Sequence, residues 1–245
     1  MKHAPRLLVL AAAAASLAAC QKMDDAAFGA RVKSYLMAHP EVLREAEVKL
    51  QENDRLAAEK ASSDAIAKYR GALEHDSRDF VANPAGKITV VEFFDYRCGY
   101  CKLAAPQVVD LIQKNPDVRF VFKQFPIFGE VSDSAARIAL TREGKAKGFE
   151  LYQALMADHA LDEAALDRHL AEVGIDPVQA RKDAEHPQIA RQIKDAQLLA
   201  TELKIDGTPA FIVGDTMVPG ADMAALKAAI ERARSARGPL GAQKS

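Results

Sequence analysis

An apolar run that ends at a cysteine pair constrains the fold of this chain most strongly. Residues 88–95 read ITVVEFFD, a β-branched and aromatic run of strand length that is typical of a strand buried on both faces. A second such run, VRFVFKQF at 118–125, follows a predicted helix that opens at Cys98 and Cys101. A strand–helix–strand order predicts two parallel strands joined by a right-handed crossover.

The later elements complete an α/β topology. Start signals predict one helix from Ser132 or Asp133, one over about 147–158, and one each from Asp162 and Asp176. A further helix is predicted from Pro187 to Lys204. Two short strands at 210–213 and 216–218 and a helix from Asp222 follow. This order predicts a thioredoxin-like fold over 81–235, with a helical insertion at about 131–204 and a flexible tail at 236–245.

The first residues have the pattern of an export signal. Residues 1–6 carry Lys2 and Arg6, and the uncharged apolar run at 7–19 suits a signal-peptide core of ~7–15 residues but not a membrane span of ~20. The run closes with LAAC, which resembles a bacterial lipobox and predicts a signal peptide at 1–19 and lipidation of Cys20. The alternative is ordinary cleavage after small residues, with Cys20 incidental. Export predicts a periplasmic, oxidising compartment, where a lipid would mask the third thiol.

Residues 20–80 are predicted to form a helical arm. Leu36, Leu43, Leu50 and Ala57 fall seven residues apart, although His39-Pro40 breaks the helix. Such a stripe either packs on the rest of its own domain or pairs with copies of itself through residues 24–71, which would make the protein a homo-oligomer. The formal net charge of −1, with no basic stripe, excludes a general affinity for nucleic acid.

The Cys98–Cys101 spacing at a helix N-terminus favours redox chemistry. Unpaired backbone N–H groups lower the pKa of a thiol there, so Cys98 is predicted to be the exposed, attacking sulfur and Cys101 the resolving one. Arg97 and Lys102 add positive charge nearby. A structural disulfide at this spacing would close a very short loop and stabilise the fold little. A zinc site would need two further ligands, so no metal cofactor is expected. Binding of Cu(I) by the two thiolates stays open as an alternative.

Several residues carry a resemblance to a known family. Pro106 lies inside the helix that follows the cysteines, and Thr208-Pro209 lies just before a strand. Together with the strand and the cysteine pair, they resemble the DsbA/DsbC group of bacterial thiol–disulfide oxidoreductases. The resemblance implies that Thr208 and Pro209 form a cis-proline loop that binds substrate backbone, and that Glu92 is a buried acid that relays the proton of Cys101. An exposed strand acid is the alternative for Glu92.

The resemblance also bears on the direction of exchange. The stretch VKSYLMAHPEVLREA is similar to the oligomerising arm of the ScsC-like branch. Oxidases of the group typically carry Pro-His between the cysteines, whereas Gly99-Tyr100 and a Thr before the proline resemble the DsbC-type isomerases. The resemblance therefore implies a disulfide isomerase or reductase with a less acidic Cys98, acting on exported cysteine-containing proteins and recycled by a membrane redox partner. A DsbA-type oxidase is the main alternative.

Overall fold

The computed structural model describes residues 25–237. The expected signal peptide, Cys20 and most of the C-terminal tail lie outside this range. Contacts divide the chain into one unit that ends at Ala57 and a second that begins at Ala58. The division falls inside a helix, whereas the sequence predicted the boundary between arm and domain at residue 80. Within residues 25–237, no helix has both the length and the apolar character needed to span a membrane.

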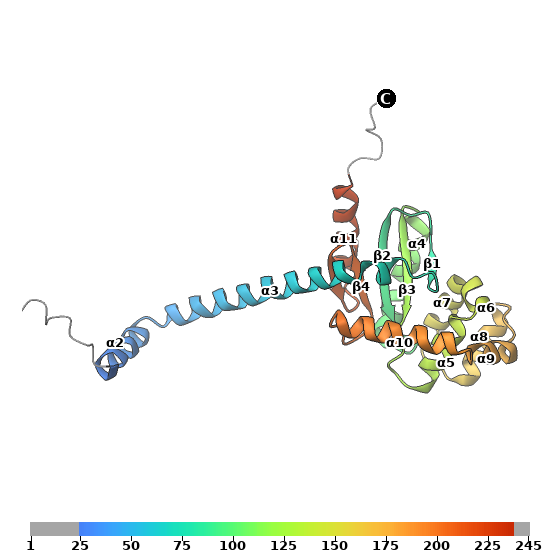
Figure 1. The fold of residues 1–245 in the computed structure, drawn as a ribbon, viewed down its shortest axis with the longest axis horizontal. Coiled ribbons are helices and arrows are strands. Elements are labelled where there is room, and N and C mark those ends of the chain that lie inside the picture. Colours follow the sequence, from blue (N-terminus) through green and yellow to red (C-terminus); the bar gives the residue numbers. More distant parts are fainter. Residues whose placement is uncertain (1–24, 238–245) are drawn as a thin grey trace, which may run out of the picture. The chain divides into compact units, whose positions relative to one another are not determined.

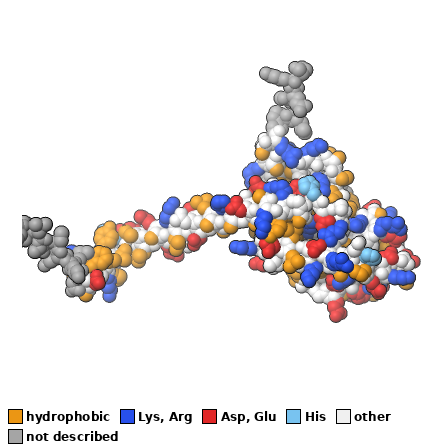
Figure 2. Space-filling view, in the orientation of Figure 1, with side chains coloured by type: hydrophobic (Ala, Val, Ile, Leu, Met, Phe, Trp, Pro, Cys, Tyr) orange, Lys and Arg blue, Asp and Glu red, His pale blue; other side chains and the backbone are white. Residues whose placement is uncertain are grey.

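Two helices, α2 (Asp25–Ala38) and α3 (Glu41–Glu74), form the beginning of the described chain. They are separated at His39 and Pro40, where the sequence predicted a break. The apolar side chains of α2 and of the first part of α3 are mostly exposed: Phe28, Val32, Tyr35, Met37, Leu43, Val48, Leu50 and Leu56. Figure 2 shows hydrophobic side chains, coloured orange, on the visible face of these two helices. The last part of α3 differs, because Ile66 and Leu73 are buried.

The second unit is built on a five-stranded mixed sheet with the strand order β1-β3-β2-β4-β5 (Figure 1). Its strands are β1 (Phe80–Ala82), β2 (Ile88–Phe94), β3 (Val118–Gln124), β4 (Ala210–Val213) and β5 (Thr216–Pro219). Strands β2 and β3 are parallel, and the other pairs are antiparallel. The thioredoxin-like α/β fold is confirmed. Strand β1 was not predicted, because three residues are too few to show a period.

Eight helices accompany this sheet in the described residues: α4 (Gly99–Lys114), α5 (Glu130–Ala139), α6 (Arg142–Ala146), α7 (Gly148–Ala157), α8 (Glu163–Glu172), α9 (Pro177–Ala184), α10 (Pro187–Glu202) and α11 (Met223–Ala236). Asp162, Asp176 and Asp222 cap α8, α9 and α11 as predicted, each accepting a hydrogen bond from a backbone N–H. The predicted start of α5 was wrong: Gly129 is its N-cap, and the short α6 was missed.

The two faces of the sheet pack against different partners. Val90, Phe94 and Phe122 face a large core that includes α4, α7, α8 and α11. Val91 and Phe93 face a second core with α10 and the end of α3. Alternate residues of β2 point to opposite faces, so the apolar run that lacked alternation is explained by burial on both sides.

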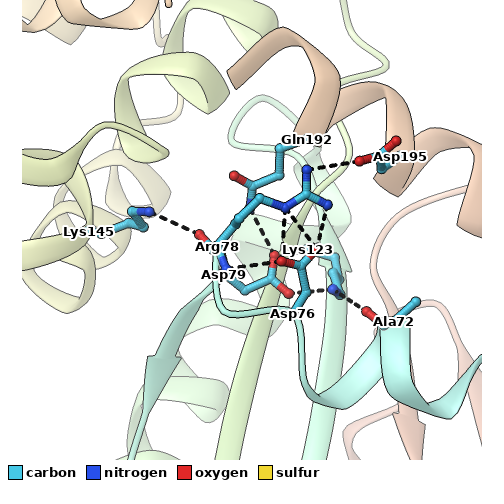
Figure 3. Close-up of polar contacts among 8 residues, drawn as sticks. All are labelled: Ala72, Asp76, Arg78, Asp79, Lys123, Lys145, Gln192 and Asp195. Carbon is cyan, nitrogen blue, oxygen red and sulfur yellow. Dashed lines mark hydrogen bonds and ion pairs between the residues drawn. The ribbon is translucent and has the colours of Figure 1, made fainter. Parts of the chain in front are cut away.

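A buried polar cluster joins the end of α3 to β3 and α10 (Figure 3). The Lys123 ammonium group forms an ion pair with Asp79 and donates to the Ala72 carbonyl at the end of α3. Gln192 of α10 donates to the same Asp79 carboxylate at 3.0 Å. Burial raises the pKa of Asp79, with Lys123 acting against that rise. Removing either member of a buried pair leaves an uncompensated charge, so this cluster holds the end of α3 on the domain.

Candidate active site

Cys98 is the residue that begins helix α4. It is the N-cap, with φ −69° and ψ 119°, and its backbone N–H donates to the Asp95 carbonyl at 3.1 Å. An N-cap side chain lies where the free N–H groups of the first helical turn point. The Cys98 side chain is at this N-cap position but forms no capping hydrogen bond of its own. Pro106 lies inside α4 as predicted, and the helix continues past it to Lys114.

The sulfur of Cys98 lies against the loop before β4. The thiol donates to the Thr208 carbonyl at 3.1 Å, and the Thr208–Pro209 peptide bond is cis. The structure thus brings together residues that are 110 positions apart in the sequence. The prediction that Cys98 is exposed was wrong, because only 2% of the residue is accessible. The loop that faces the sulfur covers it.

The surroundings of Cys98 favour its thiolate. Its pKa is lowered to about 5, first by a hydrogen bond from the Cys101 thiol, then by the Thr208 hydroxyl and the backbone N–H groups of Cys101 and Tyr100. Burial opposes this shift. The sequence predicted that Arg97 adds positive charge near the sulfurs. In the structure its guanidinium donates a hydrogen bond to the Phe128 carbonyl at 2.9 Å. At neutral pH, Cys98 is almost fully ionised and ready to attack a disulfide.

Cys101 has the opposite character. It is fully buried one helical turn further on, and burial, followed by the hydrogen bond to Cys98, raises the pKa of its thiol. Both cysteines are free thiols. A low pKa on the first sulfur and a high pKa on the second suit Cys98 to act as a nucleophile and favour a protonated Cys101. This asymmetry agrees with the roles expected from the sequence.

Glu92 lies in the middle of β2 and is fully buried, which excludes an exposed strand acid. Its register partners are Phe122 of β3 and Phe211 of β4. Burial raises the pKa of Glu92 to about 8, and a hydrogen bond from the Tyr152 hydroxyl acts in the other direction. The negative charge of Glu92 in turn raises the pKa of Cys101. A carboxyl group that titrates near neutral pH can accept a proton there and return it.

Asp95 was missed by sequence reasoning. Its buried carboxylate accepts hydrogen bonds from three elements: the backbone N–H of Arg97, those of Ile127 and Phe128, and the Ser132 hydroxyl of α5. It therefore fixes the turn before Cys98 to the loop after β3. The available signal was a charged residue at the end of an apolar strand, three positions before the first cysteine.

Lys102 is a second buried charge beside the cysteines. Its ammonium group donates to the Leu155 carbonyl near the end of α7 at 3.0 Å. Burial lowers the pKa of Lys102, while Asp158, Asp95 and both cysteines act to raise it. The predicted positive charge near the sulfurs is thus present, although it is anchored to α7. Among residues 25–237, no group of three or more His, Cys, Asp or Glu side chains is arranged to hold a metal ion.

Exposed apolar side chains lie on two segments next to Cys98: the first turns of α4 and the loop that is hydrogen-bonded to Asp95 and Arg97. Tyr100 and Leu103 in the first turns of α4 are 67% and 68% accessible. Ile127 and Phe128, on the loop held by Asp95, are also exposed. Gly99 has open space where a Cβ atom would be. This rim offers apolar contact to a polypeptide that approaches Cys98.

Thr208 provides a direct test of how the Cys98 thiolate is stabilised. Its buried hydroxyl oxygen has no hydrogen-bond partner among the described residues. The Thr208 side chain is nevertheless one of the groups that lower the Cys98 pKa, so we expect the hydroxyl to donate to the thiolate once it forms. Thr208→Val is expected to raise the pKa of Cys98 by about one unit, since a hydrogen bond to a charged group contributes ~1.5–3 kcal/mol. The pH dependence of iodoacetamide alkylation measures this pKa, with an unmodified midpoint near pH 5. Thr208→Ser keeps the hydroxyl, and an equal shift in both variants would contradict the assignment.

The comparisons with known proteins agree with this geometry. The family described as DSBA-like thioredoxin domain matches residues 89–231, and the chain belongs to that family. Residues 24–57 match a second family, described as Copper resistance protein ScsC N-terminal domain. The first match covers the thioredoxin-like domain and the second covers the arm, as the resemblance in the sequence implied.

Individual relatives are similar over different parts of the chain. The thiol:disulfide interchange protein DsbA of Bordetella pertussis is 32% identical over 136 residues, which cover 53% of this chain and 64% of that protein. The chain thus spans under two thirds of that relative. A thioredoxin-like oxidoreductase from Silicibacter pomeroyi is 40% identical, with TM-score 0.64 over 67% of this chain and 97% of that one. Proteus mirabilis ScsC in a transitional conformation is 28% identical, with TM-score 0.63 over 84% of this chain and 94% of that one.

Proposed function

We propose that the protein carries out thiol–disulfide exchange on exported cysteine-containing proteins, and that it acts mainly as a disulfide isomerase or reductase. The observation that carries the proposal is the pair of free thiols with opposed pKa shifts at the start of α4. The Cys98 thiolate attacks a substrate disulfide, forms a mixed disulfide and expels one substrate thiolate. The rim of Tyr100, Leu103, Ile127 and Phe128 favours substrates with exposed apolar segments.

Two outcomes follow from the mixed disulfide. In isomerisation, a substrate thiolate attacks another substrate disulfide, Cys98 leaves as a thiolate, and no net electrons are transferred. In reduction, Cys101 attacks Cys98 after its proton passes to Glu92. The substrate then gains two electrons, and the new Cys98–Cys101 disulfide must be reduced by an external dithiol, which we assign to a membrane redox partner.

The arm supports the isomerase direction. Its apolar side chains are exposed along α2 and the first part of α3, and residues 24–57 match the ScsC N-terminal domain. We infer that arms of several chains pair through these residues and hold several active sites near one substrate. The sequence GY between the cysteines and Thr208 before the cis proline support the same direction.

One observation favours the oxidase alternative. The pKa of Cys98, about 5, lies between values typical of thioredoxin, ~7, and of the oxidase DsbA, ~3.5. The stabilised thiolate favours the dithiol form and makes the disulfide form more oxidising. Cys98 is therefore more acidic than expected for a typical thiol of a reductase.

Refolding of a scrambled multi-disulfide protein tests the function. Reduced protein, in catalytic amount and without added oxidant, is expected to restore the native activity of the substrate, with Cys98→Ser as the inactive control. Failure to do so, together with rapid oxidation of a reduced substrate by the disulfide form, would establish the oxidase. Tight binding of Cu(I) that protects both thiols from alkylation, without any exchange, would replace both with a copper-binding role.

A periplasmic location with a lipid anchor is part of the same proposal. It rests on the apolar run at 7–19 and on LAAC, which lie outside the described residues. The mass of protein extracted from membranes is expected to show cleavage before Cys20 and an added lipid. A mature chain with an unmodified thiol, recovered from the soluble fraction, would contradict the anchor.

A further inference from the structure

Glu92 is isolated within its own sheet. It is fully buried, and the residues in register with it on both neighbouring strands are phenylalanines, Phe122 and Phe211. Neither neighbour can hydrogen bond a carboxylate. An ionised carboxyl group in such surroundings is strongly disfavoured unless a donor reaches it from outside the sheet.

That donor comes from the helical insertion. The Tyr152 hydroxyl of α7 donates to the two Glu92 carboxyl oxygens at 3.2 and 3.3 Å. No other residue between 25 and 237 donates a hydrogen bond to this carboxyl group. The Tyr152 ring is buried and packs against Phe94 and Phe122, with ring centroids 5.4 and 4.9 Å apart, which fixes the hydroxyl.

The other titratable groups around Glu92 are neutral or acidic. Cys101 of α4 and Tyr96, after β2, both interact with its charge, and burial raises the pKa of each. Lys102, a buried cation beside the cysteines, interacts with Asp158, Asp95 and both cysteines. From β3 and β4, Glu92 meets the two phenylalanines. The Tyr152 hydroxyl is therefore the group that opposes the effect of burial on Glu92.

We propose that Tyr152 is a positioning residue that keeps Glu92 ionisable near neutral pH, and so sets the pH range in which Cys101 resolves the mixed disulfide. This rests on the proposed function. In that step the Cys101 proton moves to Glu92, and the Cys101 sulfur forms a bond to the Cys98 sulfur. The Cys98–substrate bond breaks, and its electron pair leaves on the substrate thiolate. The hydroxyl of Tyr152 stabilises the carboxylate before the proton arrives.

Tyr152→Phe removes the hydroxyl and keeps the packed ring. Reduced protein is mixed with oxidised glutathione, and quenched samples are analysed by mass. The first phase is attack by Cys98, and the second is resolution by Cys101. In Tyr152→Phe, the midpoint of the second phase is expected to move up by about one pH unit, because a hydrogen bond to the ionised group is lost. Its rate at pH 7 falls about tenfold and recovers at higher pH, while the first phase is unchanged.

Two controls isolate the effect. Tyr96→Phe removes a buried hydroxyl that contacts Gln124 instead of Glu92, and is expected to leave the midpoint unchanged. In Glu92→Gln the second phase is slow and shows no such midpoint, and adding Tyr152→Phe has no further effect. If the rate of the second phase in the double variant is lower than in Glu92→Gln, Tyr152 acts on packing, and the proposal is overturned.

Titration of ¹³C-labelled Glu92 by NMR separates the two proposals. A higher Glu92 pKa in Tyr152→Phe, with the second phase shifted to match, supports the inference. An unshifted Glu92 pKa in the folded variant overturns it, as does a shifted pKa with an unchanged second phase. If the unmodified protein reacts with neither glutathione nor a protein disulfide, the proposed function itself fails, whatever the NMR titration shows.

Discussion

Cys98→Ser is expected to abolish exchange with protein disulfides, and Cys101→Ser is expected to trap them. The Cys98 thiolate is the only ionised sulfur of the pair at neutral pH, since burial keeps Cys101 protonated. A hydroxyl at position 98 is a far weaker nucleophile, so the rate is expected to fall by at least about a thousandfold. The loss is measured as the rate of reduction of a disulfide-bonded substrate by the reduced protein.

Cys101→Ser distinguishes attack from resolution. The Cys98 sulfur still attacks, but the side chain at 101 cannot displace the substrate, so a covalent complex is expected to accumulate. Non-reducing gels and mass analysis measure this complex, which disappears on addition of a small thiol. Equal activity of the two serine variants would contradict the division of roles.

Removal of the arm is expected to abolish isomerisation while leaving simple reduction of small disulfides intact. A chain that begins at Ala58 retains Ile66 and Leu73, which belong to the second core. A deletion to residue 71 would instead remove Ile66 and destabilise the domain by roughly 2–5 kcal/mol, as loss of large core side chains does. The shorter deletion therefore tests the arm without disturbing the catalytic domain.

Point substitutions test the same surface in the full chain. Leu43→Glu with Leu50→Glu places charges on side chains that are 56% and 59% accessible. If copies pair through this stripe, the oligomer is expected to dissociate and isomerisation to fall at least about tenfold, since linked active sites raise the effective concentration. Sedimentation measures the assembly. Glu45→Ala lies on the opposite side of α3 and is the matched control. Dissociation without any loss of isomerisation would show that assembly is unnecessary.

The catalytic domain was largely predictable because its signals are local. The apolar run of β2, the second strand and the cysteine pair lie within 40 residues of one another. Aspartates at 162, 176 and 222 marked helix starts because a capping side chain bonds to its own turn. Strand β1 and helix α6 escaped, because elements of three and five residues leave too short a pattern. Ser132 was predicted to cap α5, but its hydroxyl donates a hydrogen bond to the Asp95 carboxylate instead.

The properties of the site depended on contacts that no local pattern records. The sequence predicted a lowered pKa for Cys98, which the structure also gives, but it predicted an exposed sulfur, whereas the loop at Thr208 covers it. The sequence suggested from the position of Glu92 that it is a buried acid. Its hydrogen-bond donor, Tyr152, lies 60 residues further along the chain in the helical insertion, where no local pattern connects the two. Asp95 looked like an ordinary strand end until its hydrogen bonds to the loop after β3 and to α5 were visible.

The sequence alone determined the order of the longer elements, the cysteine spacing at a helix start and the apolar stripe of the arm, because periodicity and capping act within one or two turns of chain. The tertiary structure decided that the Cys98 sulfur is covered, in which direction each pKa moves and which hydroxyl meets Glu92. Those quantities depend on burial and on hydrogen bonds between segments far apart in the chain. They arise only when β2, α4, α7 and the cis-proline loop come together.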